Sequence, residues 1–491
     1  MGGDDPGGGP VAGGERAPGR GVGSAAGLRT RRPGRRRRRW TSGTGPAGVA
    51  LRGPVVGRCA DAPVLLDIVA ERLVSDGDLH CSAVRRPGDL RPVFRSRSFP
   101  PAFATASVSF VVVCAAAGVP APLYVVYQRS YGISTVALTG AFAVYVVPLL
   151  VALLCCGSLS DHVGRRRVAV PALIVGAVAC LVLATVDSSA PLIIGRAVQG
   201  VSVGLALAAL GGYVVDLAPP ARPGLAGAIT SGAPPGGIAL GALASGAAVQ
   251  LAPDGAPVWS FVVAAGLLVV AAAALALLPE TAARRPGALR SLRPEVRVPR
   301  AARPLFPMVC VVVAATYVLG GFTQALAPSL AASVLGRDDL FSGALAVAVY
   351  HLAGPAAGLA AARLPAARAL AGGALVLAAG TAGFVGAIAL GSFAAYLAAA
   401  VAAGAGFGVA FAGAIRVLLD RSPEGTRAGT LAAVYLYCYL AAAVASLLAG
   451  AAVDVWGLAP VASVLCGVVV VMSVVGAAGA ALRLRGSVDP G

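Results

Sequence analysis

From residue 103 onward, long apolar runs alternate with short polar breaks, and each run approaches the roughly 20 residues that a helix needs to cross a bilayer. Glycine and proline inside these runs are tolerated in a membrane, because neighbouring helices satisfy the backbone groups that they free. The pattern predicts an all-α membrane protein with twelve transmembrane helices, at residues 103–127, 134–156, 168–187, 190–213, 225–250, 257–279, 305–333, 340–362, 369–390, 393–419, 428–452 and 457–482.

The first part of the chain has a different pattern. Glycine, proline and arginine dominate residues 1–99, and no sustained apolar period appears there. Such a segment predicts a disordered basic N-terminal tail. Three interpretations stay open: a solvated tail, an upstream region wrongly included in the reading frame, and a functional basic arm. We expect no signal peptide, because no apolar stretch lies near the start.

Composition supports a membrane protein, since 57% of residues are hydrophobic and only 12% are charged. The net charge of +18 would suggest nucleic acid if it formed one face. However, 18 of the 39 basic residues, all of them arginine, precede residue 100, and most others lie between apolar runs. We therefore expect a lipid bilayer as partner and no nucleic acid.

Arginine is distributed unequally between alternate loops. The loops after the first, third and other odd-numbered spans hold only Arg129 and Arg337, whereas those after even-numbered spans, with the C-terminus, hold seventeen arginines. By the positive-inside rule, both termini and the loop at residues 280–304 are cytoplasmic, as in a multi-pass protein of the cell membrane.

Enzymes and metal proteins are disfavoured. The spans contain almost no acidic residues, so they offer no cluster for catalysis, and we expect no enzyme. Cysteine and histidine show no metal-binding spacing, and the chain has no phosphate-binding glycine-rich loop ending in lysine, so we expect neither metal nor cofactor.

The two halves of the chain share a pattern at an offset of 204 residues. The offset aligns Gly200 with Gly404, Gly204 with Gly408, Asp216 with Asp420 and Pro219 with Pro423. Small residues four apart allow helices to approach closely. The repeat predicts six-helix bundles at residues 100–279 and 305–482, joined by a basic linker at 280–304 and followed by a tail at 483–491.

One loop carries the most specific motif. The segment Gly157-Ser-Leu-Ser-Asp161-His-Val-Gly164-Arg-Arg-Arg167, after the second span, closely resembles the G-x-x-x-D-x-x-G-R-[RK]-[RK] signature of the major facilitator superfamily. Segment 196–200 resembles the R-x-x-Q-G segment of this family, and Leu278–Thr281 resembles its P-E-[ST] ending. The second-half copy, residues 358–368, lacks the aspartate.

The resemblance implies a transporter with two rocking bundles and one central cavity that opens alternately to each side. It implies a gating loop in which Asp161 bridges to the other bundle in the outward-open state and the arginines engage Asp216. The gating residues are Gly157, Asp161, Gly164, Arg165, Arg166, Arg167 and Asp216.

Several residues are candidates for the cavity. Arg196, inside the fourth span, is a functional candidate by default, and the alternative is a structural arginine that pairs with backbone carbonyls or snorkels to an interface. The substrate and proton candidates are Arg196, Gln199, Tyr124, Tyr145, Gln324 and His351, and further polar or aromatic candidates are Gln128, Tyr317, Thr323, Tyr435, Tyr437 and Tyr439. Small apolar walls with scattered tyrosines favour amphiphilic or aromatic solutes over highly charged ones.

The fifth span indicates a branch of the family. Residues 232–237 resemble the antiporter motif of twelve-span drug exporters, with Pro234 one position late, although a simple helix kink is the alternative. The predicted helix-packing residues are Gly200, Gly204, Gly232, Pro234, Gly236, Gly237, Gly404 and Gly408.

Proton coupling needs a group that changes charge, and no acid occurs between Phe103 and Gln128. His351 and Asp216 are the remaining candidates, although a lone histidine in a helix often serves only in packing. We expect a monomeric secondary transporter that exports drugs or metabolites in exchange for protons. A uniporter or importer of a small organic solute is the alternative, and a non-transporting membrane sensor is the other class.

Overall fold

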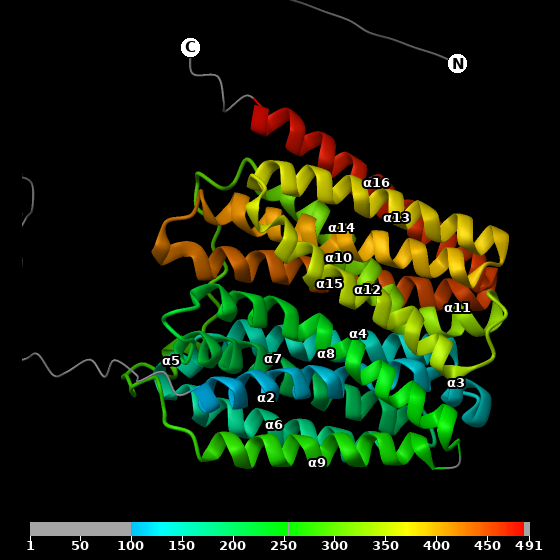
Figure 1. The fold of residues 1–491 in the computed structure, drawn as a ribbon, viewed down its shortest axis with the longest axis horizontal. Helices are drawn as coiled ribbons and strands as arrows, with labels where there is room; N and C mark the ends of the chain where they lie inside the picture. The colour runs from blue at the N-terminus through cyan, green and yellow to red at the C-terminus, as the bar shows by residue number, and fades with distance from the viewer. Residues whose placement is uncertain (1–99, 254, 486–491) are drawn as a thin grey trace, which may run out of the picture. The chain divides into compact units, whose positions relative to one another are not determined.

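The computed structural model describes residues 100–253 and 255–485, which form helices joined by short loops (Figure 1). The predicted tail at residues 1–99 and residues 486–491 lie outside the described part of the chain. The first half contains α2 Pro100–Gly118, α3 Pro120–Tyr131, α4 Thr135–Cys156, α5 Leu159–Val163, α6 Arg165–Leu183, α7 Ser189–Asp216, α8 Pro223–Leu251, α9 Ala256–Ala276 and the 3₁₀ turn η1 Arg290–Leu292.

The second half repeats this order. It contains α10 Phe306–Ala325, α11 Ala327–Ser333, α12 Leu340–Ala360, η2 Ala361–Arg363, α13 Ala366–Leu390, α14 Phe393–Leu419, η3 Glu424–Thr426, α15 Arg427–Trp456 and α16 Leu458–Arg485. Each half begins with a span in two pieces, α2 with α3 and α10 with α11. Proline at the start of α3 and α11 explains both breaks, because it has no N–H to continue the preceding helix.

The predicted fold class, twelve transmembrane helices in two six-helix bundles, is confirmed. Within the described ranges, eleven helical spans are long and apolar enough to cross a membrane. The twelfth helix, α8, has 29 residues and no charged side chain, but its glycines and prolines dilute its apolar residues. The predicted span ends differ from the observed ones by a few residues; the third span, for example, begins at Arg165.

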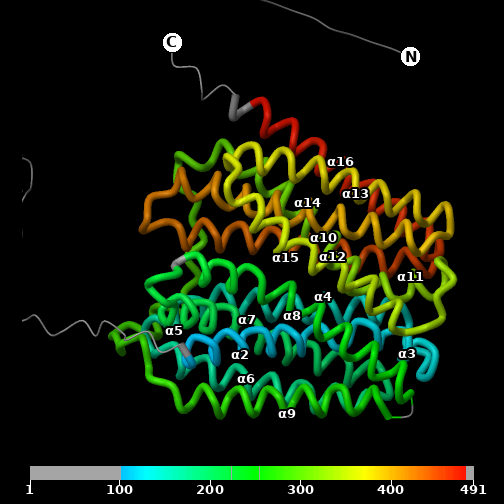
Figure 2. The backbone as a smooth tube through the Cα atoms, in the orientation of Figure 1, coloured from blue at the N-terminus to red at the C-terminus, as the bar shows by residue number. Residues whose placement is uncertain are grey.

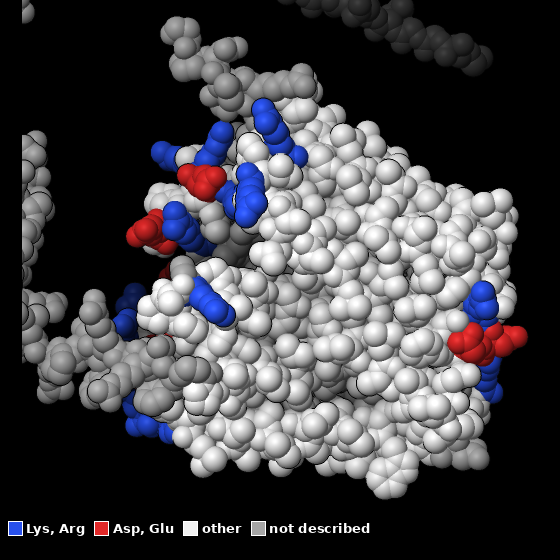
Figure 3. All heavy atoms as spheres, in the orientation of Figure 1, with Lys and Arg blue, Asp and Glu red and all other residues white. Residues whose placement is uncertain are grey.

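Charge divides the surface into a band and two ends. On the face drawn in Figure 3, charged atoms gather at opposite edges, and the wide band between them has none. Apolar side chains such as Val151, Val178 and Val263 are 54%, 49% and 58% exposed, as expected for residues that face lipid. We call the end that holds Arg165 the arginine-rich end and the end that holds Arg129 the arginine-poor end.

Glycine contacts are equivalent in the two halves. In each half, two glycines of the fourth span lie against backbone carbonyls of the second span, so close that a β carbon would overlap them. The contacts join Gly200 to Tyr145, Gly204 to Leu149, Gly404 to Tyr350 and Gly408 to Gly354. Helix α7 therefore packs on α4 as α14 packs on α12, in each case through glycines of the predicted pattern.

The two halves form separate groups of helices, coloured blue to green and yellow-green to red in Figure 2. They meet where α8 packs on α12 and where α4 packs on α15. The linker lies against both halves at the arginine-rich end: the Arg285 N–H donates to the His162 carbonyl at 2.9 Å, and the Arg297 N–H donates to the Gly429 carbonyl at 3.3 Å. The halves therefore contact each other through these four helices and, at the arginine-rich end, through the linker.

Candidate functional site

A cavity of about 130 Å³ lies between the two halves. Helices α4 and α8 line it from the first half, and α10, α12, α14 and α15 line it from the second. Its walls are mostly aromatic and small apolar side chains, and of the described residues no charged one contributes. The lining residues are Phe142, Tyr145, Val146, Leu149, Pro234, Pro235, Ile238, Thr316, Tyr317, Gly320, Gly321, Gln324, Tyr350, His351, Phe407, Tyr439 and Ala442.

Aromatic rings of the second half support one another along this wall. Tyr317 and Tyr439 meet edge to face, with ring centroids 4.9 Å apart. Tyr350 stacks on Phe407 at 5.8 Å, and its hydroxyl donates to the Thr316 carbonyl at 3.0 Å. Such ring pairs add stability beyond their buried area. The second half therefore presents a rigid aromatic surface to the cavity.

His351 supplies a polar atom to this surface. Its Nδ1 lies 2.9 Å from the Val347 carbonyl one turn earlier in α12, and its ring meets Tyr350 edge to face at 5.2 Å. A carbonyl only accepts hydrogen bonds, so Nδ1 carries the proton and Nε2 of the neutral ring is an acceptor. Within residues 100–485 as described, nothing donates to Nε2.

Some predicted cavity residues lie elsewhere. Tyr145, Gln324 and His351 line the cavity, and so does Pro234, but Arg196, Gln199 and Tyr124 do not. These three are buried behind the wall. The Arg196 guanidinium lies over the far side of the first-half wall, 4.2 Å from the centre of the Tyr145 ring.

The break in the first span explains the position of Arg196 and Gln199. Ala116 has no helical N–H partner four residues later, because Pro120 occupies that position. The Gln199 amide donates to the Ala116 carbonyl at 2.9 Å, and Arg196 donates to the Ala117 carbonyl at 3.3 Å and to Gln199 at 2.5 Å. The alternative of an arginine paired with carbonyls describes this arrangement.

The gating loop, residues 157–167, follows the end of α4 and contains the short helix α5. The side chain of Arg165 contacts Asp161 at 2.5 Å and Asp216 at 3.2 Å. It also donates to the Ser160 hydroxyl at 2.8 Å. The predicted contact between the arginines and Asp216 is therefore present. In this structure Asp161 contacts its own loop, and its bridge to the other bundle in an outward-open state stays a prediction.

The start of α6 is tied to the end of the sixth span. The Arg166 N–H donates to the Glu280 carboxylate at 3.2 Å, and its guanidinium donates to the Leu278 carbonyl at 2.6 Å. Gly164 has a φ of +122°, and a β carbon there would overlap the Glu280 carboxylate. Glycine is thus required by both backbone and space. In the described part of the chain, the Arg167 side chain makes one hydrogen bond, to the Val163 carbonyl at 3.4 Å.

The second-half copy of this loop is held differently. It lacks the aspartate, and Arg416 near the end of α14 donates instead to the carbonyls of Leu364 at 2.8 Å and Ala362 at 3.1 Å. Arginine-to-carbonyl contacts replace the arginine-to-aspartate pairs of the first half. The two halves are therefore unequal at the arginine-rich end.

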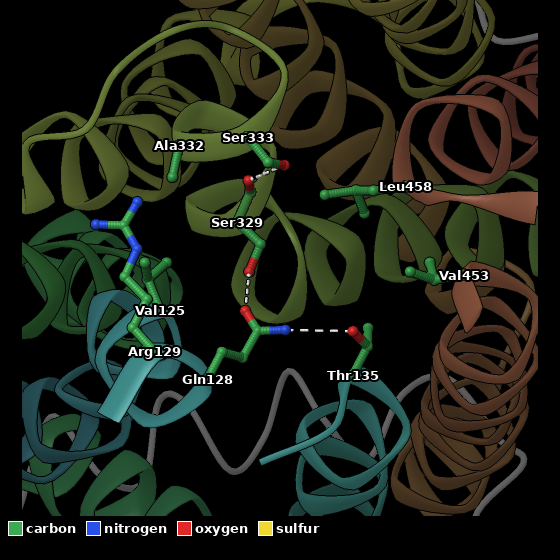
Figure 4. Close-up of a pocket in the computed structure, with 9 residues that line it drawn as sticks. All are labelled: Val125, Gln128, Arg129, Thr135, Ser329, Ala332, Ser333, Val453 and Leu458. Atoms are coloured by element: carbon green, nitrogen blue, oxygen red, sulfur yellow. Dashed lines mark hydrogen bonds between the residues drawn. The ribbon is translucent and has the colours of Figure 1, made fainter. Parts of the chain in front are cut away.

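At the arginine-poor end, polar side chains join the two halves directly (Figure 4). The Ser329 hydroxyl of α11 donates to the Gln128 side-chain oxygen of α3 at 2.9 Å, and the Gln128 amide donates to Thr135 at 3.2 Å. We call Gln128, Thr135 and Ser329 the polar latch. Nearby, Arg129 pairs with Asp338 at 3.5 Å, with side chains 54% and 89% exposed. Ser329 could not be identified from the sequence, because its partner Gln128 lies 201 residues away.

Asp339 begins α12 at the same end. Its carboxylate accepts a hydrogen bond from the Ser342 N–H at 2.8 Å, the usual geometry of an N-cap. Partial burial alone would raise the pKa of this carboxyl, but hydrogen bonds from Ser342 and the charge of Arg337 outweigh burial and lower the pKa below its ordinary value of 3.8. The cap is therefore charged at neutral pH.

The antiporter-like segment of α8 lies between α2 and the cavity. A β carbon on Gly237 would meet the Val111 carbonyl of α2 at 2.8 Å, and Gly232 lies near Pro355 of α12. Nothing in the described structure lies within 4 Å of the same point on Gly236. Among these predicted packing residues, Gly237 makes the close helix contact, whereas Pro234 faces the cavity.

The comparisons with known proteins agree with this geometry. The family model described as Major Facilitator Superfamily matches residues 106–445. Among solved structures, the chain is similar to a partially occluded inward open conformation of the xylose transporter XylE from E. coli. The two share 15% sequence identity over 76% of this chain and 95% of that chain, with a TM-score of 0.59, which shows a common fold. No curated protein matches the chain.

Proposed function

The chain belongs to the Major Facilitator Superfamily, and from this premise we propose that it is a secondary active transporter that exports small organic solutes by alternating access. The single observation that carries the proposal is the cavity between the two halves, which is lined by helices of both. A solute bound there would be released when the halves rock about it.

The arginine-rich end is the cytoplasmic one in this proposal, and the protein lies in the cell membrane with both termini inside. The support is the distribution of arginine, since seventeen loop and tail arginines fall on one side of the predicted spans and two on the other.

The contacts between the halves support a state closed at the arginine-poor end. In the described chain, the hydrogen bond from Ser329 to Gln128 and the ion pair of Arg129 with Asp338 are the direct polar contacts between the halves. Thr139 and Gly450 also touch near this end. These contacts must break before the cavity can open outward.

Proton exchange is the coupling that we propose. His351 is the cavity residue whose ordinary pKa lies near neutrality, and protonation of its Nε2 would remove a hydrogen-bond acceptor from the site. A proton and a solute that both use Nε2 would exclude each other, which is the requirement for antiport. The close packing of Gly237 on α2 agrees with an antiporter-like fifth span.

A uniporter is the second candidate function. The observation that favours it is the lining of the cavity, which contains no carboxylate among the described residues. A uniporter needs no group that changes charge, so such a cavity would suffice.

One experiment tests both candidates. Purified protein in proteoliposomes is assayed for flux of neutral aromatic solutes, with and without an imposed pH gradient. Antiport predicts uphill flux driven by the gradient and its loss in His351→Gln. Uniport predicts flux that only follows the solute gradient. If no solute moves faster than in protein-free liposomes, a non-transporting role replaces both.

A further inference from the structure

We propose that the cavity binds an uncharged, single-ring aromatic molecule that carries an O–H or N–H donor, and that Nε2 of His351 accepts the hydrogen bond from that donor. The inference rests on the proposed transport function, because it names the substrate class of the same cavity.

Size limits the ligand to about one ring. The cavity measures about 130 Å³ in the state described. An apolar protein cavity of about 150 Å³ is large enough for benzene. The cavity is slightly smaller than this, so it is close to the size of a single ring and too small for a molecule of several fused rings.

The walls favour a flat aromatic solute. Two ring pairs form the wall of the second half, Tyr317 with Tyr439 and Tyr350 with Phe407. Tyr145 faces them from α4 of the first half. Aromatic rings prefer offset or edge-to-face contact with other rings, and this cavity provides them from both halves.

Charge in and around the cavity disfavours a cation. Of the residues described, none that lines the cavity is acidic, so a bound cation would lie in an apolar site without a counter-charge. In addition, the Arg196 guanidinium occupies a position over the Tyr145 ring, 4.2 Å from its centre. This buried positive charge already makes a cation–π contact with the Tyr145 ring, and it would repel a cation bound in the cavity.

The free acceptor of His351 indicates that the ligand carries a hydrogen-bond donor. His351 Nδ1 is committed to the Val347 carbonyl, which leaves Nε2 as an acceptor. His351 lines the cavity, and none of the described residues donates a hydrogen bond to Nε2. A ligand with an O–H or N–H group satisfies Nε2, whereas a ligand without one leaves it unpaired.

Binding is measured on the purified full-length protein in nanodiscs by isothermal titration calorimetry. The probes are phenol, its methyl ether anisole, and the cation phenyltrimethylammonium, which each carry one ring and differ in donor and charge. We expect the phenol to bind about fivefold more tightly than the ether, the usual effect of one neutral hydrogen bond. We expect still weaker binding of the cation. Equal affinity for phenol and ether, or tightest binding of the cation, would overturn the proposal.

Variants test the role of His351. His351→Leu should abolish the preference for phenol over ether, and His351→Gln should retain part of it, because a side-chain carbonyl also accepts. Tyr437→Phe is the matched control: Tyr437 is 45% exposed and does not line the cavity, so the preference should stay as in the wild type. If a folded His351→Leu protein still prefers the phenol over the ether as strongly as the wild type, His351 does not accept the hydrogen bond from the ligand. If that variant does not fold, the comparison of ligands on the wild-type protein still decides the donor requirement.

Flux measurements separate this inference from the proposed function. Selective phenol binding without flux in proteoliposomes would contradict transport but keep the ligand class. Flux of a lipophilic cation without phenol binding would keep transport and contradict the ligand class.

Discussion

The polar latch at the arginine-poor end predicts which residue holds the two halves together. Replacing Gln128 with alanine removes its bonds to Ser329 and Thr135, of which only the bond to Ser329, at 2.9 Å, crosses between the halves. One partly buried neutral hydrogen bond contributes about 1 kcal/mol net. Since about 1.4 kcal/mol corresponds to a factor of ten, Gln128→Ala should shift the equilibrium about fivefold toward the state open at this end.

The neighbouring ion pair should matter less. Arg129 and Asp338 are 3.5 Å apart, and their side chains are 54% and 89% exposed. Solvent and salt screen such a pair, so its contribution is close to zero on the usual scale of about 0 to 1 kcal/mol. We expect Arg129→Ala to change the equilibrium less than about twofold.

The assay uses one reporter cysteine at Ala332, which lines the pocket beside the polar latch (Figure 4), in a background without the native cysteines. The rate of alkylation by a polar maleimide reports the fraction of molecules open at this end. Ser333→Ala is the matched control, because the Ser333 hydroxyl donates only to the Ser329 carbonyl of its own helix, at 2.7 Å. The double variant of Gln128→Ala with Ser329→Ala should react no faster than either single variant.

Two results would refute this reasoning. Gln128→Ala and Ser333→Ala could react equally fast, in which case the bond between the halves does not hold the closed state. Alternatively, Arg129→Ala could exceed Gln128→Ala, in which case exposed charge rather than the buried amide dominates.

Three further predictions concern other parts of the chain. Asp161→Asn removes one partner of Arg165 and should lower initial flux in proteoliposomes while the yield of folded protein stays unchanged; undiminished flux would exclude a gating role. Gly204→Ala should destabilise the protein by about 1–3 kcal/mol in thermal unfolding, because its β carbon would overlap the Leu149 carbonyl, whereas Gly211→Ala in the same helix meets nothing within 4 Å and should be tolerated. Asp339→Ala should cost about 1 kcal/mol through loss of the α12 cap. Because folding lowers the Asp339 pKa, the charged cap contributes fully above its ordinary pKa of 3.8 and is lost as pH falls through the lower folded value. The difference in unfolding temperature between the wild type and Asp339→Ala should therefore shrink between about pH 7 and pH 3, and a constant difference would contradict a charged cap.

Features that depend on nearby residues were predictable from the sequence alone. Spans follow from runs of apolar residues, because a bilayer imposes one length on every crossing helix. The gating loop is a continuous segment, so its motif predicted the contact of its arginines with Asp216, which Arg165 makes at 3.2 Å. The repeated glycines predicted close helix pairs, because a residue without a β carbon lets the backbone of any neighbouring helix approach closely.

Only the tertiary structure decided which side chains face the cavity. Arg196 and His351 were equal candidates as polar residues inside spans, yet Arg196 lies behind Tyr145 and His351 lines the cavity. The rotation of each helix about its axis determines this outcome, and it depends on partners far away in sequence, such as the carbonyls that the break at Pro120 leaves free for Gln199 and Arg196. The polar latch was hidden for the same reason, because the apposition of Gln128 and Ser329 exists only once the two halves have packed together.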